Sequence, residues 1–370
     1  MSNSLGLIFR VTSFGESHGR CVGILVDGCP AGLSLRVEDI QAELERRRPS
    51  QNPLTTRRAE EDRVEILSGV FNGFTTGAPI CMIVWNRAAD PSRYEALRWR
   101  PRPGHADYPA HLKYGGFNDH RGGGRFSGRI TAGYVMAGAL AKMVLRQQLG
   151  VEVLAYASEI GGIKARSLTI DEIRRGTEKS PVRCPDPEAS EWMEAEIRRA
   201  SAEGDSLGGV VECIVENPPI GLGEPVFDTL EGEISKALYS IPGVKAVEFG
   251  LGMKASRIRG SENNDEYRLL GGRVTCITNN AGGILGGMSN GMPITCRAAF
   301  KPTPSIRKPQ RTVDLSKMEE VTLEVEGSHD PCIVPRAVPV VEAMVAVVLV
   351  DQAMRCGLIP RVLEARLNGR

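Results

Sequence analysis

A turn pattern that occurs twice constrains the fold of this 370-residue chain more than any other feature. The pattern V-x-x-x-P-x-G-L stands at Val26–Leu33 and again at Val215–Leu222, each time after β-forming residues and before an expected helix. A second pair of turns, Gly73–Ile80 and Gly287–Ile294, follows in the same order. Two pairs in one order predict an internal duplication, with chance similarity of turn motifs as the alternative.

A duplication would also set the fold class. Each half has the pattern of a strand–helix–strand–strand unit, and its sheet must bury one face against another element. Two such units packed together give an α/β (α+β) sandwich with pseudo-twofold symmetry. We therefore expect one domain, 1–370, built from two related halves at about 1–160 and 205–370. The polar stretch near 165–205 contains an expected helix, Pro187–Ala202, and is predicted to be a surface insertion.

Local patterns predict further elements. Strands are expected at Leu7–Thr12, Val22–Val26, Val64–Leu67 and Pro79–Trp85, and helices at Val37–Arg48, Arg129–Leu149, Phe227–Ser240 and Pro335–Cys356. The last helix is apolar around most of its circumference, which predicts burial, and its longest apolar run is too short to span a bilayer. From Arg87 to Gly124 the chain is irregular and rich in proline and glycine, which is typical of a functional segment.

Composition narrows the function classes. The net charge is +1, so no global field points to nucleic acid or to an anionic membrane. Nine cysteines without a C-x-x-C pair, together with the lack of a secretory leader pattern, predict a reduced, soluble, cytoplasmic protein. There is also no H-E-x-x-H motif, so the sequence predicts no metal site.

Basic charge gathers instead in one glycine-rich stretch, Arg121–Ala139, with the sequence RGGGRFSGRITAGYVMAGA. Its three consecutive glycines let the backbone approach a ligand closely. The helix that follows directs its first N–H groups and its positive dipole end to the same place, and three arginines add fixed charge. These parts predict a phosphate receptor; the alternative is a surface loop with solvated arginines.

The histidines are the candidate proton donors. Four of the five precede residue 125, and His18 and His105 lie in turn-forming segments beside a carboxylate. An imidazole in that setting suits proton donation near neutral pH, although a structural hydrogen-bonding role is equally compatible with each ring. Further candidate loops are NNAGGILGG at 279–287, KPTPS at 301–305 and the turn Gly327–Pro331.

Taken in order, these motifs resemble the chorismate synthase family over essentially the whole chain. The three family signatures are present at Gly15–Pro30, Gly124–Ala139 and His329–Met344, and RPGHAD at 102–107, NNAGGILGG and KPTPS match further family blocks. The resemblance implies anti-1,4-elimination of phosphate from 5-enolpyruvylshikimate 3-phosphate to give chorismate, in the shikimate pathway of aromatic amino acid biosynthesis. It also implies a β-α-β-α sandwich, a homotetramer and reduced FMN without net redox change, with NADPH acting only as an indirect reductant.

The resemblance further implies roles for residues at matching motif positions. His18 would protonate the departing phosphate, His105 would protonate or hydrogen-bond the reduced flavin, and Asp330 would support proton removal. The substrate carries one phosphate and two carboxylates, and the residues expected to bind these anions are Arg47, Arg48, Arg129 and Arg336. The residues expected to bind the flavin are Arg125, Phe126, Ser127, Gly286, Lys301, Pro302, Thr303, Pro304, Ser305 and Ser328.

Four positions depart from the family pattern. Phe126 stands where many members have a small hydroxyl residue, Ile130 where many have glutamate, and Ser328 where arginine is usual; Pro53 lies in the vicinity of another arginine of some relatives. We interpret them as a lineage variant with rearranged contacts. Two alternatives stay open. One is a catalytically weakened homologue that binds flavin or phosphate ligands; the other is an RNA-binding protein, against which the near-neutral net charge argues.

Overall fold

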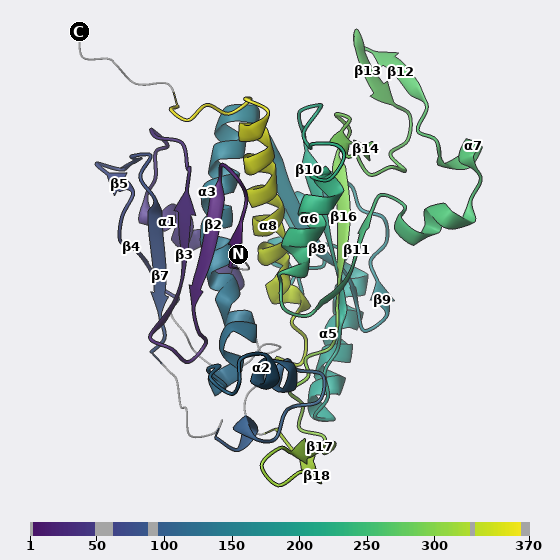
Figure 1. Cartoon of the computed structure of the whole chain (residues 1–370). Helices are drawn as coiled ribbons and strands as arrows, with labels where there is room; N and C mark the ends of the chain where they lie inside the picture. The colour runs from purple at the N-terminus through teal and green to yellow at the C-terminus, as the bar shows by residue number, and fades with distance from the viewer. Residues whose placement is uncertain (1–2, 49–61, 88–94, 326–329, 364–370) are drawn as a thin grey trace.

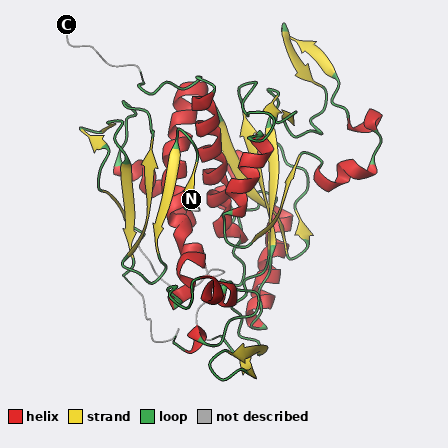
Figure 2. Cartoon of the chain, in the orientation of Figure 1, coloured by secondary structure: helices red, strands yellow, loops and turns green. Residues whose placement is uncertain are grey.

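Two antiparallel sheets enclose a layer of helices (Figures 1 and 2). The computed structural model describes residues 3–48, 62–87, 95–325 and 330–363. The first sheet contains, in spatial order, β1 (Ser4–Leu5), β2 (Arg10–Gly15), β3 (Cys21–Asp27), β7 (Ile80–Trp85) and β4 (Val64–Ile66). The second contains β11 (Val244–Phe249), β16 (Ile294–Phe300), β10 (Gly209–Glu216), β8 (Glu152–Ile160) and β9 (Ile163–Lys164). The expected mixed α/β class is confirmed.

The helix layer joins the two sheets into one core. Its members are α1 (Val37–Arg47), α3 (Thr131–Leu149), α6 (Leu230–Tyr239) and α8 (Val334–Arg355). Helix α3 packs on the first sheet, α8 packs on the second, and the two helices pack on each other. They approach so closely that a Cβ atom on Gly138 would overlap the side chain of Ala343. The small residues of α3 therefore set the spacing between the sheets.

Helix α8 is buried along almost its whole length, as its composition predicted. Among the described residues it is the one helix whose length and hydropathy match a membrane span, yet its apolar window is 100% buried within the fold. Helix α8 is therefore a core helix, packed against α3 on one side and against the second sheet on the other.

The second sheet is also covered on its outer face, and a short fourth layer results. Helix α4 (Ile170–Gly176) places Ile173 against Tyr156 of β8 and Ile214 of β10, which point away from α8. Helix α5 (Pro187–Ala202) follows at the residues that the sequence predicted, with Asp186 accepting a hydrogen bond from the N–H of Ala189.

The two halves share one topology and one pattern of turn contacts. Strand β3, α1, β4 and β7 follow each other as do β10, α6, β11 and β16, and the strands pair in the orders β3-β7-β4 and β10-β16-β11. In each half, a hairpin hydroxyl donates to the carbonyl of the turn proline and accepts from the N–H of the turn leucine. The residues are Thr75 with Pro30 and Leu33 in the first half, and Ser289 with Pro219 and Leu222 in the second.

Two local predictions need correction. The strand expected at Leu7–Thr12 begins only at Arg10, because the N–H groups of residues 7–9 donate to the Asp351 carboxylate and form a turn. The segment expected to be irregular contains a short helix, α2 (Asp107–Lys113), beside the lower end of α3 in Figure 1. The turn at residues 7–9 is not visible in local periodicity, because its Asp351 partner is more than 340 residues away. Helix α2 has only 7 residues, which is too short to show a sustained period.

Candidate active site

A cavity of about 540 Å³ lies at the end of the sandwich where α3 and α8 begin. Its walls come from the loop after β2, the C-terminal end of α1, the segment 102–106, the start of α3, the loops after α6 and β16, and the start of α8. The positive ends of two helix dipoles therefore border one space, whose size suits small-molecule ligands.

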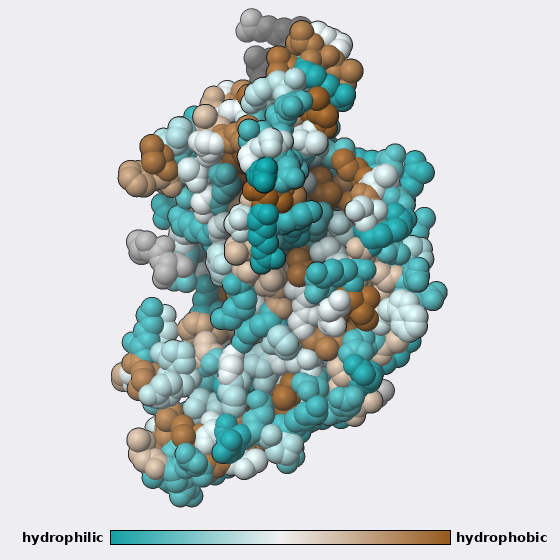
Figure 3. All heavy atoms as spheres, turned by 90° about the vertical axis from the view of Figure 1, so that its right-hand side faces the viewer, coloured by the Kyte–Doolittle hydropathy of each residue, from teal (hydrophilic) through white to brown (hydrophobic). Residues whose placement is uncertain are grey.

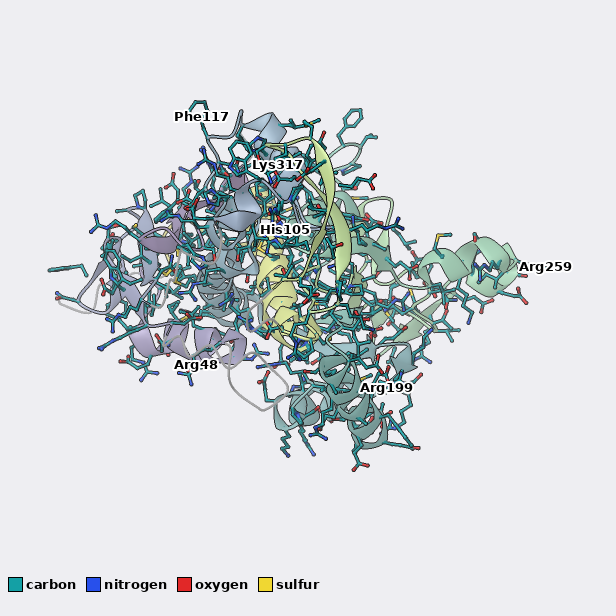
Figure 4. The ribbon with its side chains drawn as sticks, turned by 90° about the horizontal axis from the view of Figure 1, so that it is seen from below. Arg48, His105, Phe117, Arg199, Arg259 and Lys317 are labelled. Atoms are coloured by element: carbon teal, nitrogen blue, oxygen red, sulfur yellow. The ribbon has the colours of Figure 1, made fainter. Side chains whose placement is uncertain are left out.

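The cavity gathers most of the residues that the sequence singled out. The ones that line it are His18, Arg47, His105, Arg125, Phe126, Ser127, Arg129, Lys301, Pro302, Thr303, Pro304, Ser305, Asp330 and Arg336. Two candidates lie elsewhere: Arg48 pairs with Glu45 at 3.2 Å, and Gly286 follows β14 (Ile284–Leu285) near the upper end of the second sheet. Seen from below in Figure 4, His105 lies near the centre and Arg48 near the edge. Ser328 lies outside the described residues.

The three glycines of the central stretch separate the two candidate histidines. Gly122, Gly123 and Gly124 all have positive φ, within the 3-10 segment Arg121–Phe126. A Cβ atom on Gly122 would clash with the ring of His18, and one on Gly123 would lie 3.0 Å from Cε1 of His105. Gly122 and Gly123 are therefore glycine for two reasons: their positive φ and the imidazoles packed against them.

His18 is almost fully buried, with 6% of its surface exposed. Its Nδ1 atom is 3.2 Å from the hydroxyl of Ser17, which also lines the cavity. The sequence patterns predicted no role for Ser17, although it immediately precedes the candidate histidine. The buried hydroxyl can orient the ring and take part in its proton exchange.

His105 belongs to a second cluster, with Asp107 and Arg102. Nδ1 of His105 is 2.6 Å from Oδ1 of Asp107, and the Arg102 guanidinium contacts both oxygens of the same carboxylate, at 2.7 and 2.9 Å. Burial alone raises the pKa of Asp107, but the hydrogen bonds from Arg102 and His105 outweigh it and hold the pKa well below its usual range. Asp107 is therefore a carboxylate in the folded protein.

Arg47 and Arg129 meet at the buried carboxylate of Asp62. Arg47 Nη1 is 3.0 Å from Oδ2 of Asp62, while Arg129 Nη1 donates to the other oxygen. Burial raises the pKa of Asp62, but the two guanidiniums outweigh that effect and lower it. Arg47 also donates to Thr131 Oγ1 and to the Gly128 carbonyl, which ties α1 to the start of α3. Asp62 was not predicted, because no local motif brings it to these arginines.

The remaining charges give the cavity a cationic lining. Arg336 of α8 donates to Asp330 and, at 3.2 Å, to the carbonyl of Arg47. Within the described part of the chain, six cationic side chains and one carboxylate line the cavity. The six are Arg47, Arg102, Arg125, Arg129, Lys301 and Arg336, and the carboxylate is Asp330. Such a lining selects anionic molecules that carry several charges.

One wall combines these charges with a flat apolar surface. The ring of Phe126 is 37% exposed and borders the cavity next to Arg125 and Ser127. In the segment that follows β16, Lys301 donates to the Gly104 carbonyl, and burial lowers the pKa of the lysine. Thr303 Oγ1 is buried without a hydrogen-bond partner among the described residues, so a polar atom there still needs a ligand.

Comparison with known proteins decides the family. A family model described as chorismate synthase matches residues 9–354. The chorismate synthase of Dehalococcoides mccartyi is 57% identical over 364 residues, which cover 98% of this chain and 100% of that protein. That of Korarchaeum cryptofilum is 57% identical over 350 residues, which cover 95% and 97%. The chain belongs to the chorismate synthase family.

The three-dimensional comparison agrees. A crystal structure of a chorismate synthase superposes with a TM-score of 0.74 at 31% identity, covering 95% of this chain and 93% of the other. Chorismate synthases are lyases that eliminate phosphate, in the shikimate pathway, and this chain is such a lyase by its full-length similarity. Phe126 and Ile130, two of its departures from the family pattern, both line the cavity. Pro53 lies outside the described residues.

Proposed function

We propose that the elimination of phosphate from 5-enolpyruvylshikimate 3-phosphate, which gives chorismate, takes place in the cavity at the lower end of α3 and α8. One observation carries this proposal: two histidines and six cationic side chains line one space that contains a single carboxylate among its described residues. A substrate with one phosphate and two carboxylates matches that charge, and each charge-assisted hydrogen bond contributes about 1.5–3 kcal/mol.

The substrate anions bind Arg47, Arg129 and Arg336 in this proposal. All three lie at the junction of α1, α3 and α8, where Asp62 and Asp330 hold their guanidiniums in place. His18 then protonates the departing phosphate, since it is buried beside Ser17 at the same wall. Asp330 supports proton removal. Arg48 and Gly286, which lie outside this cavity, have no role in it.

Reduced FMN is the cofactor that the family implies, and the second wall fits it. Arg125 and Lys301 would bind its phosphate, the Phe126 ring offers a flat surface, and Thr303 Oγ1 is a buried hydroxyl in need of a partner. Ser127 and the rest of the 301–305 segment complete that wall, with His105 facing it as the proton donor. When bound, the reduced flavin supplies electron density to the reaction transiently. A role for Ser328 remains a sequence-based expectation.

The decisive experiment is an anaerobic assay with dithionite-reduced FMN. Phosphate and chorismate should be released together, and replacement of either His18 or His105 by alanine should lower turnover by about 10²–10⁴-fold. Parallel reactions with NADPH and oxidised FMN test whether the chain reduces its own flavin; we expect no turnover. Ligand binding without any product would instead identify a catalytically silent homologue.

We also propose a cytoplasmic homotetramer. The hairpin of β12 (Tyr267–Leu270) and β13 (Arg273–Cys276) projects from the body, and apolar residues gather there (Figures 1 and 3). Leu269 is 77% exposed and Val274 is 64% exposed, which is typical of a surface that another chain covers. Sedimentation velocity of the purified protein tests the number of chains.

Finally, we propose that the two halves arose by duplication of one strand–helix–strand–strand unit, with 165–205 as an insertion. The support is the shared strand order together with the matched hydroxyl contacts of Thr75 and Ser289. Superposition of the two halves alone would test it, because equivalent strands should then coincide in register as well as in order.

A further inference from the structure

The contact between His105 and Asp107 fixes where the ring carries its proton. A carboxylate can only accept hydrogen bonds, and Oδ1 of Asp107 is 2.6 Å from Nδ1 of His105. Because Asp107 is charged in the folded protein, the hydrogen between the two atoms belongs to Nδ1. The neutral ring is therefore the Nδ1–H tautomer, with Nε2 unprotonated.

Arg102 makes this arrangement rigid. Its Nε and Nη2 atoms donate to the two oxygens of Asp107, and its backbone N–H donates to Oδ2 at 3.0 Å. Three donors from one residue prevent the carboxylate from rotating away from the ring. Arg102 is itself fixed, because Nη1 donates to Ser305 Oγ at 3.1 Å. The cluster therefore links RPGHAD to KPTPS, two segments about 200 residues apart.

The ring is also confined sterically. Nη2 of Arg102 lies 3.1 Å from Nδ1 and 3.4 Å from Nε2 of His105, and Nδ1 cannot accept because it already carries a proton. On another side, the α-carbon of Gly123 packs so closely that a Cβ atom there would lie 3.1 Å from Nε2. The ring is therefore held in one position between Arg102, Asp107 and Gly123.

From this geometry we propose that Asp107 is a positioning residue for His105. It holds the Nδ1–H tautomer and so makes Nε2 the atom that exchanges a proton with the molecule in the cavity. The tautomer follows from the contacts of Asp107 and from its charge, whereas its catalytic consequence rests on the proposed function.

The tautomer is tested directly by nitrogen NMR. Protein labelled with ¹⁵N-histidine should show, for His105 in its neutral form, a protonated Nδ1 and an unprotonated Nε2. A His105→Gln sample identifies the resonances among the five histidines. An unprotonated Nδ1 in the wild-type protein would overturn the proposal, and this measurement requires neither FMN nor substrate.

The variant Asp107→Asn should reverse the protonation of the two ring nitrogens of His105. The amide has one acceptor, and the Arg102 cation competes for it, so the amide NH₂ turns toward His105 and donates to Nδ1. The ring proton should then move to Nε2. An unchanged tautomer in correctly folded Asp107→Asn would show that Asp107 does not set it.

Turnover provides the second readout. We expect Asp107→Asn to lower kcat by about 10–100-fold, with little change in KM, because His105 is misprotonated while the substrate arginines are untouched. The control is Asp314→Asn, which removes a similar carboxylate contact from Arg100, 3.0 Å away, without reaching the cavity. Its kcat should equal that of the wild-type protein. Equal kcat in Asp107→Asn would refute the positioning role, whereas a wild-type protein without turnover would refute only the proposed function.

Discussion

Arg46 and Arg47 are neighbours on α1, yet they enter two different buried charge clusters. Arg46 binds Glu342 of α8 through both terminal nitrogens, and Lys142 of α3 contacts the same carboxylate at 3.0 Å. Arg47 binds Asp62 and lines the cavity. Successive helix residues point about 100° apart, so one side chain enters the helix layer and the other enters the site.

The two clusters differ in charge balance and in access. Around Arg46 and Lys142 stand three carboxylates, Glu43, Glu178 and Glu342, and none of these groups lines the cavity. Around the cavity, cations exceed carboxylates, and the excess faces an open space. Buried charge by itself therefore does not indicate a binding site. An excess of one sign, directed at a cavity, does.

The largest effect should come from the cluster of Arg46, Lys142, Glu43, Glu178 and Glu342, here called the closed cluster because none of its members lines the cavity. Glu342→Gln leaves Arg46 and Lys142 buried with less compensation, and we expect the free energy of unfolding to fall by roughly 3–5 kcal/mol. Urea denaturation measures this loss. Activity per folded molecule should be unchanged, because Glu342 does not reach the cavity. A large change in KM without loss of stability would contradict the comparison.

The cluster of Arg47, Arg129 and Asp62, which opens onto the cavity, should respond in the opposite way. Arg47→Ala removes one partner of Asp62 and one cation from the cavity, and we expect kcat/KM to fall by about 10²-fold or more, equivalent to roughly 3 kcal/mol. The matched variant is Arg46→Ala, one residue earlier on the same helix. It should lower stability while leaving kcat/KM of the folded protein unchanged, and the reverse result would break the distinction.

Acid should also act on the closed cluster. Burial raises the pKa of Glu342, but Arg46 and Lys142 outweigh it and lower the pKa below the ordinary 4.5. A carboxylate with a lowered pKa stabilises the fold above that ordinary value, and this contribution is lost as the pH falls below it. Thermal unfolding between pH 6 and about 3 should show the loss, and Glu342→Gln should flatten the curve.

The smallest effect is expected at Arg48, the third arginine in the run. It is partly exposed and pairs only at the surface with Glu45 in the described structure, so Arg48→Ala should cost about 0–1 kcal/mol. Substrate affinity should stay within error of the wild-type value. A KM increase comparable to that of Arg47→Ala would restore the sequence-based assignment of Arg48 to the substrate.

Arg46, Arg47 and Arg48 show which features of the fold and the site the sequence could predict and which it could not. Local sequence patterns predicted α1, α5 and α8, because the residues that favour a helix follow one another along the chain itself. These patterns could not separate Arg46 from Arg48, since that depends on which layer each side chain enters. Family motifs predicted one shared site, and all described candidates except Arg48 and Gly286 line a single cavity.

The two carboxylates without a predicted role differ in how far away their partners are. Asp62 reaches Arg47 and Arg129 across 15 and 67 positions, whereas Asp107 lies within the same segment as Arg102 and His105 and was noted in the sequence only as a neighbour of His105. A carboxylate such as Asp62 needs no local pattern, because its partners come from other segments. Its contacts are visible only in the three-dimensional structure, as is the pairing of Asp107 with both Arg102 and His105.

The glycine triplet between His18 and His105 has a consequence for engineering. Hydrogen atoms of Gly122 and Gly123 are all that separates the two rings from the backbone, so the loop acts as a spacer of fixed thickness. Neither imidazole can be relocated by enlarging its neighbour without displacing this shared strip of main chain, and with it the other ring. Any redesign of one candidate proton donor must therefore be a redesign of both.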